Sequence, residues 1–426
     1  MNFKENLAFY LEENFVDELI DSLNDTRVNS LILNTNKIDK DTFVKLFPKI
    51  IPHSFLENVF YYNKEDYEFG KSFLFTNGAY YIMDTSSMLV SYNLKINDND
   101  KVLDLCAAPG GKTIALSLFN KDKNFYILSN DLSYKRSLEL SKNIEHLGLK
   151  NVLISNSDFS KIYNHYLNTF DKIIVDAPCS GSAMFRKNEL AKLDWTIDKV
   201  NKLKSEQISI LNYALKMLKN GGKLIYSTCS FSYEEDEGVI LEILKENKDV
   251  SVLPFTEHEG YFHHNSLKES IHLFPNLYKG EGQFMCLLTK NNDEVNITYK
   301  NKPNIKHKNL LNSLNYNNEV IIDDELYFYN AFINTKYLNV IRYMLDAYQI
   351  KKDIFIPSFH LAHAINKSDI KLDENEAKKY LHGEELTKKL NLKNDYYIVS
   401  YLNVNLGYVK YVNGKLKNLY PKGLRR

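Results

Sequence analysis

The sequence is poor in cysteine, and its four cysteines stand far apart, at positions 106, 179, 229 and 286. No two of them form a C-x-x-C pair, so we expect neither a zinc site nor a thioredoxin-like redox motif, and no metal. The residues after Met1 do not form a signal peptide, and no apolar run approaches the length of a membrane span. These absences favour a cytoplasmic protein with free thiols and no membrane contact.

The chain also lacks an excess of either charge sign, since 54 Lys and Arg balance 54 Asp and Glu. The total charge therefore identifies no partner, but its distribution is uneven. The last stretch, Lys410–Arg426, has six basic residues and no acidic one. A solvated charged terminus is the default interpretation. Because Tyr408, Tyr411 and Tyr420 stand among these charges, we favour contact with RNA, through phosphate neutralisation and base stacking.

A length of 426 residues predicts two or three domains. After a mixed N-terminal segment, in which residues 7–23 have helical spacing, strand-like and helix-like segments alternate, and this alternation predicts a mostly parallel, doubly wound sheet. The predicted units are an N-terminal accessory domain (1–75), a catalytic domain (76–290), a polar linker (291–309) and a C-terminal region (310–426), with the hairpin signal Asn413-Gly414 near its end.

Within the catalytic domain the apolar periodicity places the individual elements. A capping-box pattern, Ser232–Glu235, would begin the last helix. We predict strands at 101–106, 125–131, 152–157, 171–176, 223–227 and 284–289, and helices at 113–119, 134–147, 200–218 and 234–246.

A glycine-containing loop, Asp104–Thr113, follows the first of these strands and begins a helix. Small residues there let the backbone approach a ligand, and the helix start offers free N–H groups. A phosphate-binding P-loop is excluded, because its first glycine would fall at position 106, which is Cys. A plain strand-to-helix turn is the alternative interpretation.

Acidic residues end the next three strands and favour a nucleotide-like ligand. Asp131 follows the second strand, where a carboxylate typically binds ribose hydroxyls in Rossmann-like folds. Asp158 follows the third strand, near the expected place of an adenine ring, although a solvated loop carboxylate fits it nearly as well. Asp176 ends the fourth strand. Since parallel strands end at one sheet edge, we expect these side chains to surround one site.

Two cysteines follow strands that end at the same edge, Cys179 in Asp176–Gly181 and Cys229 in Ser227–Ser230. Two thiols at one ligand-binding edge indicate covalent chemistry. Free cysteines are usually core residues, but both of these stand in turns of small polar residues. The pattern alone leaves open which thiol attacks. Cys286, inside an apolar run, is expected in the core.

The loop Cys106–Thr113 and the two cysteine motifs, in this order and spacing, resemble the Nop/Sun (Fmu-like) RNA cytosine-5 methyltransferases. The resemblance covers residues 25–290 and includes Arg27–Asn29 and Gly78–Ile82. Leu416–Arg425 resembles the tail of the RsmF-type branch, which modifies small-subunit ribosomal RNA. One departure is Asp84-Thr85-Ser86, where the family usually has Glu-Pro-Ser.

The resemblance implies an α/β fold with a Rossmann-like S-adenosylmethionine methyltransferase domain, the small mixed α/β N-terminal domain and a C-terminal PUA-like RNA-binding module at about 375–426. It also implies Cys229 as the nucleophile and Cys179 as the residue that assists product release, with Asp176 completing the catalytic set. The implied cofactor is S-adenosylmethionine, bound by Cys106, Ala107, Ala108, Pro109, Gly110, Gly111, Lys112, Asp131, Asp158 and Asp176.

The implied activity is methylation of C5 of specific cytidines in 16S ribosomal RNA, and the implied partner is this RNA or the small ribosomal subunit. Two other functions stay open: a transfer-RNA or DNA cytosine-5 methyltransferase, and a methylation-inactive RNA-binding assembly factor. One catalytic domain with one RNA module predicts a monomer. Arg186 and Lys187 are candidates for phosphate contacts. His272 is expected to pack rather than react, and His258, His263 and His264 lack a clear metal-ligand spacing.

Overall fold

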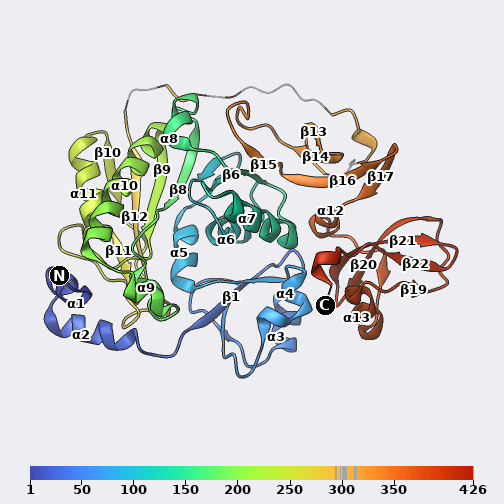
Figure 1. Cartoon of the computed structure of the whole chain (residues 1–426), viewed down its shortest axis with the longest axis horizontal. Coiled ribbons are helices and arrows are strands. Elements are labelled where there is room, and N and C mark those ends of the chain that lie inside the picture. Colours follow the sequence, from blue (N-terminus) through green and yellow to red (C-terminus); the bar gives the residue numbers. More distant parts are fainter. Residues whose placement is uncertain (293–294, 298, 300–304, 311–313, 426) are drawn as a thin grey trace.

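The structure is a computed structural model that describes residues 1–425 apart from 293–294, 298, 300–304 and 311–313 (Figure 1). The predicted linker 291–309 therefore lies partly outside the described residues, as does Arg426 at the end of the basic tail. No helix in the described part of the chain is long and apolar enough to cross a membrane.

A mixed sheet forms the centre of the molecule, with strands in the order β10-β12-β9-β8-β5-β6-β7-β15, and β11 pairs with β12. The middle strands β9, β8, β5, β6 and β7 run parallel, and β12 and β15 are antiparallel to their neighbours. The strands are β5 (Lys101–Asp104), β6 (Tyr126–Asn130), β7 (Val152–Ser155), β8 (Phe170–Asp176), β9 (Leu218–Thr228), β10 (Val250–Leu253), β11 (Ile271–Leu273), β12 (Gln283–Lys290) and β15 (Val340–Arg342).

Helices cover both faces of this sheet, which explains why the central residues of its parallel strands are apolar on both faces (Figure 1). Val102 packs toward α5, α6 and α7, whereas the next residue, Leu103, packs toward α10 and α11. The predicted doubly wound α/β arrangement is thus confirmed. The helices are α5 (Thr85–Asn93), α6 (Gly111–Phe119), α7 (Tyr134–Leu147), α8 (Phe159–Ile162), α9 (Glu189–Leu193), α10 (Ile197–Met217) and α11 (Glu237–Glu246).

The N-terminal segment forms a small antiparallel sheet in the order β2-β3-β1-β4. The single helix expected in 7–23 is two helices, because the chain turns between Phe9 and Glu12. The elements are α1 (Phe3–Ala8), α2 (Glu13–Ser22), β1 (Asn29–Leu33), α3 (Lys40–Leu46), β2 (Ile51–Pro52), β3 (Val59–Tyr62), α4 (Phe73–Thr76) and β4 (Tyr80–Ile82).

The C-terminal region contains two further sheets, in the orders β13-β14-β16-β17 and β18-β20-β21-β22-β19. The predicted hairpin is present: Asn413 and Gly414, both with positive φ, join β21 to β22. The elements are β13 (Asn318–Ile322), β14 (Glu325–Tyr329), β16 (Leu345–Lys351), β17 (Ile354–Pro357), α12 (Phe359–Ala364), β18 (Ile370–Lys371), α13 (Glu374–His382), β19 (Leu386–Thr387), β20 (Asp395–Tyr401), β21 (Val404–Val412) and β22 (Lys415–Asn418).

Candidate active site

A cavity of about 270 Å³ lies at the edge of the central sheet where β5, β8 and β9 end. Parallel strands bring their carboxyl ends together at one edge, which is the usual ligand-binding edge of such sheets. The cavity is lined by Asp104, Asp176 and Cys229, by the loop residues Cys106, Ala107, Ala108, Pro109, Gly111 and Lys112, by residues of the segments 81–84 and 281–283, and by Ser87, Ala183, Met184 and Lys187.

The two cysteine turns meet beside this cavity. The sulfur atoms of Cys179 and Cys229 lie 3.2 Å apart, and both side chains are half-buried. A hydrogen bond from the Cys179 thiol lowers the pKa of Cys229, and the same contact, together with burial, raises the pKa of Cys179. Lys112 also lowers the pKa of Cys229, against the opposing effects of burial and Asp176. The geometry therefore favours a thiolate on Cys229 and a proton on Cys179.

Glu235 is fully buried and holds both cysteine turns at once. Its carboxylate accepts hydrogen bonds from the Ser180 amide at 2.8 Å, from the Ser180 hydroxyl and from the Ser230 hydroxyl at 2.7 Å. Ser180 directly follows Cys179, and Ser230 directly follows Cys229. A single carboxylate thus sets the spacing of the two turns, and burial raises its pKa.

The capping box predicted at Ser232–Glu235, which would include this glutamate, is wrong. The helix α11 begins later, after Asp236, which makes no side-chain capping hydrogen bond. Glu235 instead binds the cysteine turns, and Gln207 adds a further hydrogen bond to the same carboxylate. Its side-chain amide donates to Glu235 at 3.1 Å and to the Pro178 carbonyl at 2.9 Å.

Asp176 and Lys112 are two charged residues in the lining of the cavity. The two side chains make an ion pair of 2.7 Å, and Lys112 also donates to the Ser87 hydroxyl at 2.9 Å. The other carboxylate oxygen of Asp176 accepts hydrogen bonds from the Ser227 hydroxyl at 2.8 Å and the Gln283 amide at 3.3 Å. These contacts hold the carboxylate in one orientation beside Cys229.

The glycine loop is held in shape by a buried carboxylate behind it. Gly110 adopts a left-handed conformation (φ 107°) where α6 begins. Asp131 accepts hydrogen bonds from the Ala108 amide at 3.2 Å and the Ser133 amide at 2.9 Å, and pairs with Arg136 at 3.4 Å. Asp131 therefore supports the loop from outside the lining of the cavity.

Asp104, which begins the predicted loop but is not among the predicted site residues, is a buried residue in the lining of the cavity. One of its oxygens accepts a hydrogen bond from the Thr113 hydroxyl at 2.6 Å, and the other has no hydrogen-bond partner among the described residues. Burial raises the pKa of Asp104 to about 7, although the Thr113 hydrogen bond acts in the opposite direction. An unpaired buried oxygen on a residue that lines a cavity indicates a site for a ligand donor group.

Asp158 stands apart from the cavity lining. Its carboxylate begins α8 by accepting a hydrogen bond from the Ser160 amide at 3.2 Å. It also pairs with Lys161 at 2.8 Å, and the hydrogen bonds from Lys161 and Ser160 lower its pKa. The structure thus shows a capping role for Asp158, and its part in cofactor binding stays a prediction.

The remaining two cysteines differ from the pair. Burial raises the pKa of Cys106, so its thiol is held neutral although the residue lines the cavity. Cys286 is fully buried in β12, as expected, and burial raises its pKa as well.

The start of β12 and the residues just before it contribute cavity residues that the sequence motifs did not indicate. Gln283 and Glu281 both line the cavity, and each is 2% exposed. Neither oxygen of Glu281 accepts a hydrogen bond from a described residue, although Arg27 makes an ion pair with it at 3.6 Å. One sequence feature could have indicated this part of the site: Gly280 and Gly282 stand on either side of a glutamate, directly before an apolar run.

The helices α1 and α2 pack in one hydrophobic cluster with Cys229 and Phe231 of the second cysteine turn. The Tyr10 hydroxyl donates to the carbonyl of Phe231, two residues after Cys229. Arg186, a candidate for phosphate contacts, instead donates to the Ser22 carbonyl at the end of α2 at 2.6 Å. Lys187, its neighbour, lines the cavity.

The histidines take structural positions. His272 is fully buried, lies 2.8 Å from the Glu237 carboxylate and stacks on Phe274, which confirms the expected packing role. His258 stacks on Phe55. Within the described part of the chain, no group of three or more His, Cys, Asp or Glu side chains is arranged to hold a metal ion.

Two family models match the chain. The model of the 16S rRNA methyltransferase RsmB/F family matches residues 91–289, and that of the methyltransferase RsmF PUA domain matches residues 367–426, so that together they cover more than half of the sequence. The chain belongs to the RsmB/F methyltransferase family. It is therefore a methyltransferase with a PUA domain near its carboxyl end, as the sequence motifs predicted.

Curated relatives agree with this family. The ribosomal RNA small subunit methyltransferase F of Aeromonas salmonicida is 27% identical over 96% of this chain and 94% of its own length. The protein of the same name from Vibrio parahaemolyticus is 30% identical over 68% of this chain and 62% of its own length. The 25S rRNA (cytosine-C(5))-methyltransferase nop2 of Schizosaccharomyces pombe is 31% identical over 51% of this chain and 38% of its own.

Solved structures share the fold of the catalytic part. A methyltransferase homologue from Pyrococcus horikoshii is 28% identical, with a TM-score of 0.58, and the match covers 66% of this chain and 92% of that one. NSun6 from Pyrococcus horikoshii, solved with SFG, gives a TM-score of 0.61 over 68% of this chain and 98% of that one. At 20% identity the second likeness shows the fold alone.

The aromatic residues of the basic tail belong to the core of the PUA domain. Tyr411 and Tyr420 are 5% and 2% exposed, and Tyr420 packs edge-on against Tyr380. The expectation that they stack on RNA bases is therefore wrong, because folding of the domain covers both rings. Lys417 and Lys422 remain exposed.

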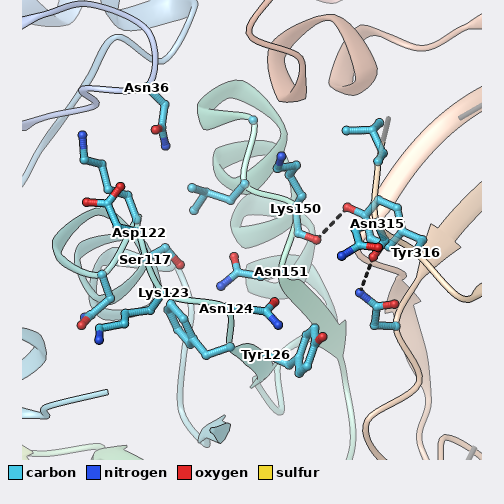
Figure 2. A pocket seen from close by; sticks show the side chains of 17 residues that line it. Asn36, Ser117, Asp122, Lys123, Asn124, Tyr126, Lys150, Asn151, Asn315 and Tyr316 are labelled. Carbon is cyan, nitrogen blue, oxygen red and sulfur yellow. Dashed lines mark hydrogen bonds between the residues drawn. The ribbon is translucent and has the colours of Figure 1, made fainter. Parts of the chain in front are cut away.

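A second, larger cavity of about 400 Å³ lies at the opposite end of the parallel strands (Figure 2). It is lined by polar side chains such as Asn124 and Asn151, and the Tyr316 hydroxyl of the C-terminal region donates to the Lys150 carbonyl at its rim at 2.9 Å. None of the residues predicted for cofactor binding or catalysis lines it. We therefore expect the chemistry at the smaller cavity, whose lining includes Cys229 and the glycine loop.

Proposed function

We propose that this protein methylates C5 of specific cytidines in small-subunit ribosomal RNA, using S-adenosylmethionine as the methyl donor. The observation that carries the proposal is the pair of sulfur atoms 3.2 Å apart, Cys179 and Cys229, beside a cavity lined by the glycine loop. The curated relatives support the RNA substrate, and the nop2 relative supports the C5 position by its name.

The cavity residues fit the proposed methyl donor. The unpaired buried oxygen of Asp104 suits an ammonium group, and the small residues of the loop leave the backbone accessible. Bound there, S-adenosylmethionine would supply an electrophilic methyl group. The residues proposed to hold it are Asp104 and Asp176, the loop Cys106–Lys112 and, from behind the loop, Asp131, with Asp158 at the adenine end.

The protein side of the reaction follows from the acidity of the two thiols. C5 of cytosine is too weak a nucleophile to take a methyl group directly. The Cys229 thiolate adds to C6, so that a C–S bond forms, the 5,6 double bond is lost, and electron density moves to C5 and N3. Asp176 accepts a hydrogen bond from the 4-amino group and orients the base, which must leave its stack to reach the cavity.

After the methyl group has joined C5, a base removes the C5 proton, the 5,6 double bond reforms and the Cys229 thiolate leaves. Cys179 is placed to assist this release, because its thiol donates a hydrogen bond to the Cys229 sulfur and so stabilises the departing thiolate. The geometry suits this division of roles, in which the more acidic sulfur attacks and the less acidic one keeps its proton.

Two substitutions test these roles on RNA. We expect Cys229→Ala to abolish both methylation and the covalent RNA adduct, because no sulfur then reaches C6. We expect Cys179→Ala to form the adduct and accumulate it, which a denaturing gel with labelled RNA would show. An adduct with Cys229→Ala but none with Cys179→Ala would reverse the assignment.

The substrate is tested separately. Bisulfite sequencing of RNA from a deletion strain should show lost methylation in small-subunit ribosomal RNA. Loss of methylation in transfer RNA alone would favour a transfer-RNA cytosine-5 methyltransferase. RNA binding without any methyl transfer from a radiolabelled donor would favour an assembly factor.

The domain boundaries, the monomeric state and the cytoplasmic location stay predictions.

A further inference from the structure

The strand register places Gln283 next to Cys229. β12 runs antiparallel to β9, and the register pairs Phe284 with Thr228, the last residue of β9. Continued by one residue, this register brings Gln283 opposite Cys229. Residues opposite each other in an antiparallel pair project to the same face, and both side chains line the cavity. Gln283 is therefore at the place where a base attacked by Cys229 must lie.

The orientation of the Gln283 amide is set by Asp176. Its nitrogen, Nε2, donates to Asp176 Oδ1 at 3.3 Å. An ionised carboxylate is only an acceptor, so a flipped amide would place Oε1 against a carboxylate oxygen and lose this hydrogen bond. Asp176 cannot rotate to relieve that contact, because Ser227 holds Oδ1 and Lys112 holds Oδ2. The cavity thus presents an acceptor with a donor beside it.

This pair of groups complements one base. Cytosine carries a donor at N4 beside an acceptor at N3, whereas uracil carries an acceptor at O4 beside a donor at N3. We infer that Gln283 is the residue that selects cytosine over uracil: its second Nε2 hydrogen donates to N3 while Asp176 accepts from N4. The inference rests on the proposed function, to which it adds the N3 contact.

The same contact would assist the chemical step. When the Cys229 thiolate adds to C6, part of the negative charge moves onto N3. A donor placed at N3 therefore binds the adduct more strongly than the ground state, which lowers the barrier rather than only the substrate dissociation constant. Gln283 thus acts on kcat as well as on base choice.

The test asks whether the effect of the Gln283 side chain depends on the N3 atom of the base. Wild-type protein and Gln283→Met are compared on small-subunit ribosomal RNA in which the methylated cytidine, once located, is replaced by 3-deazacytidine. This base has C–H in place of N3. We expect Gln283→Met to lower methylation of cytidine about tenfold and to lower the cytidine-to-3-deazacytidine rate ratio by about the same factor.

Two further variants keep the test decisive. Thr289→Val removes a buried hydrogen bond of 2.9 Å at the other end of β12 and should leave the rate ratio unchanged. Gln283→Glu has nearly the same shape, and its carboxyl group can donate to N3 only when protonated. Its activity relative to wild type should therefore rise as the pH falls.

An equal rate ratio in wild type and Gln283→Met, or a pH-independent activity of Gln283→Glu relative to wild type, would overturn the inference while leaving the proposed function intact. Wild-type protein that methylates no cytidine would instead refute the proposed function. A purely structural role for Gln283 would lower the rates on both bases by one factor, and the ratio separates this case.

Discussion

Replacing Glu235 by alanine tests the idea that one buried carboxylate positions both reactive thiols. The side chain accepts two hydrogen bonds from Ser180, one from Ser230 and one from Gln207, and all four donors are buried or half-buried. In Glu235→Ala these donors lose their acceptor, and the turns that carry Cys179 and Cys229 lose the group that joins them.

The size of the effect follows from the number and type of these contacts. A hydrogen bond to a charged group contributes about 1.5–3 kcal/mol net, and such contributions do not add when they share one side chain. Because breaking a buried charged network typically costs about 3–5 kcal/mol, we expect a loss of this size in the free energy of unfolding. A displacement of either thiol by about 1 Å would slow adduct formation roughly a hundredfold.

The assay separates positioning from folding. Adduct formation is followed with RNA that carries 5-fluorocytidine, since fluorine at C5 cannot leave as a proton and the adduct accumulates. Glu235→Gln keeps the shape of the side chain and one acceptor oxygen, so its free energy of unfolding should fall by only about 1 kcal/mol. It should still form the adduct measurably more slowly than wild type.

The neighbouring glutamate supplies the control. Glu234 accepts hydrogen bonds from Asn6 in α1, at 3.1 Å, rather than from the cysteine turns. Glu234→Ala should therefore leave adduct formation within about threefold of wild type, which corresponds to less than about 1 kcal/mol. A folded Glu235→Ala that forms adduct as fast as Glu234→Ala would refute the positioning role.

Three further perturbations have defined outcomes. Cys179→Ala removes the hydrogen bond that lowers the pKa of Cys229, so the thiolate forms at higher pH; the rising limb of the adduct-formation rate should move to higher pH, and an unmoved limb would count against the sulfur contact. Gly282→Ala places a Cβ 2.4 Å from an aromatic ring at φ 119°, and chemical denaturation should show a loss of about 1–3 kcal/mol. Replacing Lys417 and Lys422 by alanine should weaken RNA binding at low salt and reduce the slope of log affinity against log salt by about 1.4, if both contact phosphates of single-stranded RNA; an unchanged slope would place the RNA elsewhere.

Much of the fold was predictable because its signals are local. The apolar strands from β5 to β9, the helix Tyr134–Leu147 and the hairpin at Asn413-Gly414 each depend on residues within one short window. The helix expected at 234–246 was placed too early, because the Ser232–Glu235 pattern resembles a capping box. Its glutamate instead accepts hydrogen bonds from Ser180 and Gln207, which are far away in the sequence, and no local pattern predicts these contacts.

By itself, the sequence determined that the glycine loop, Asp176 and both cysteines share one edge of the sheet, since each stands at the end of a strand that periodicity identifies. It could not rank the two thiols without a family resemblance, because acidity depends on what each sulfur contacts. Only the tertiary structure brought Cys179 within 3.2 Å of Cys229 and placed Gln283 and Cys229 in the lining of one cavity. These residues are 50 or more positions apart in the sequence, and packing and register, rather than local spacing, decide which side chains meet.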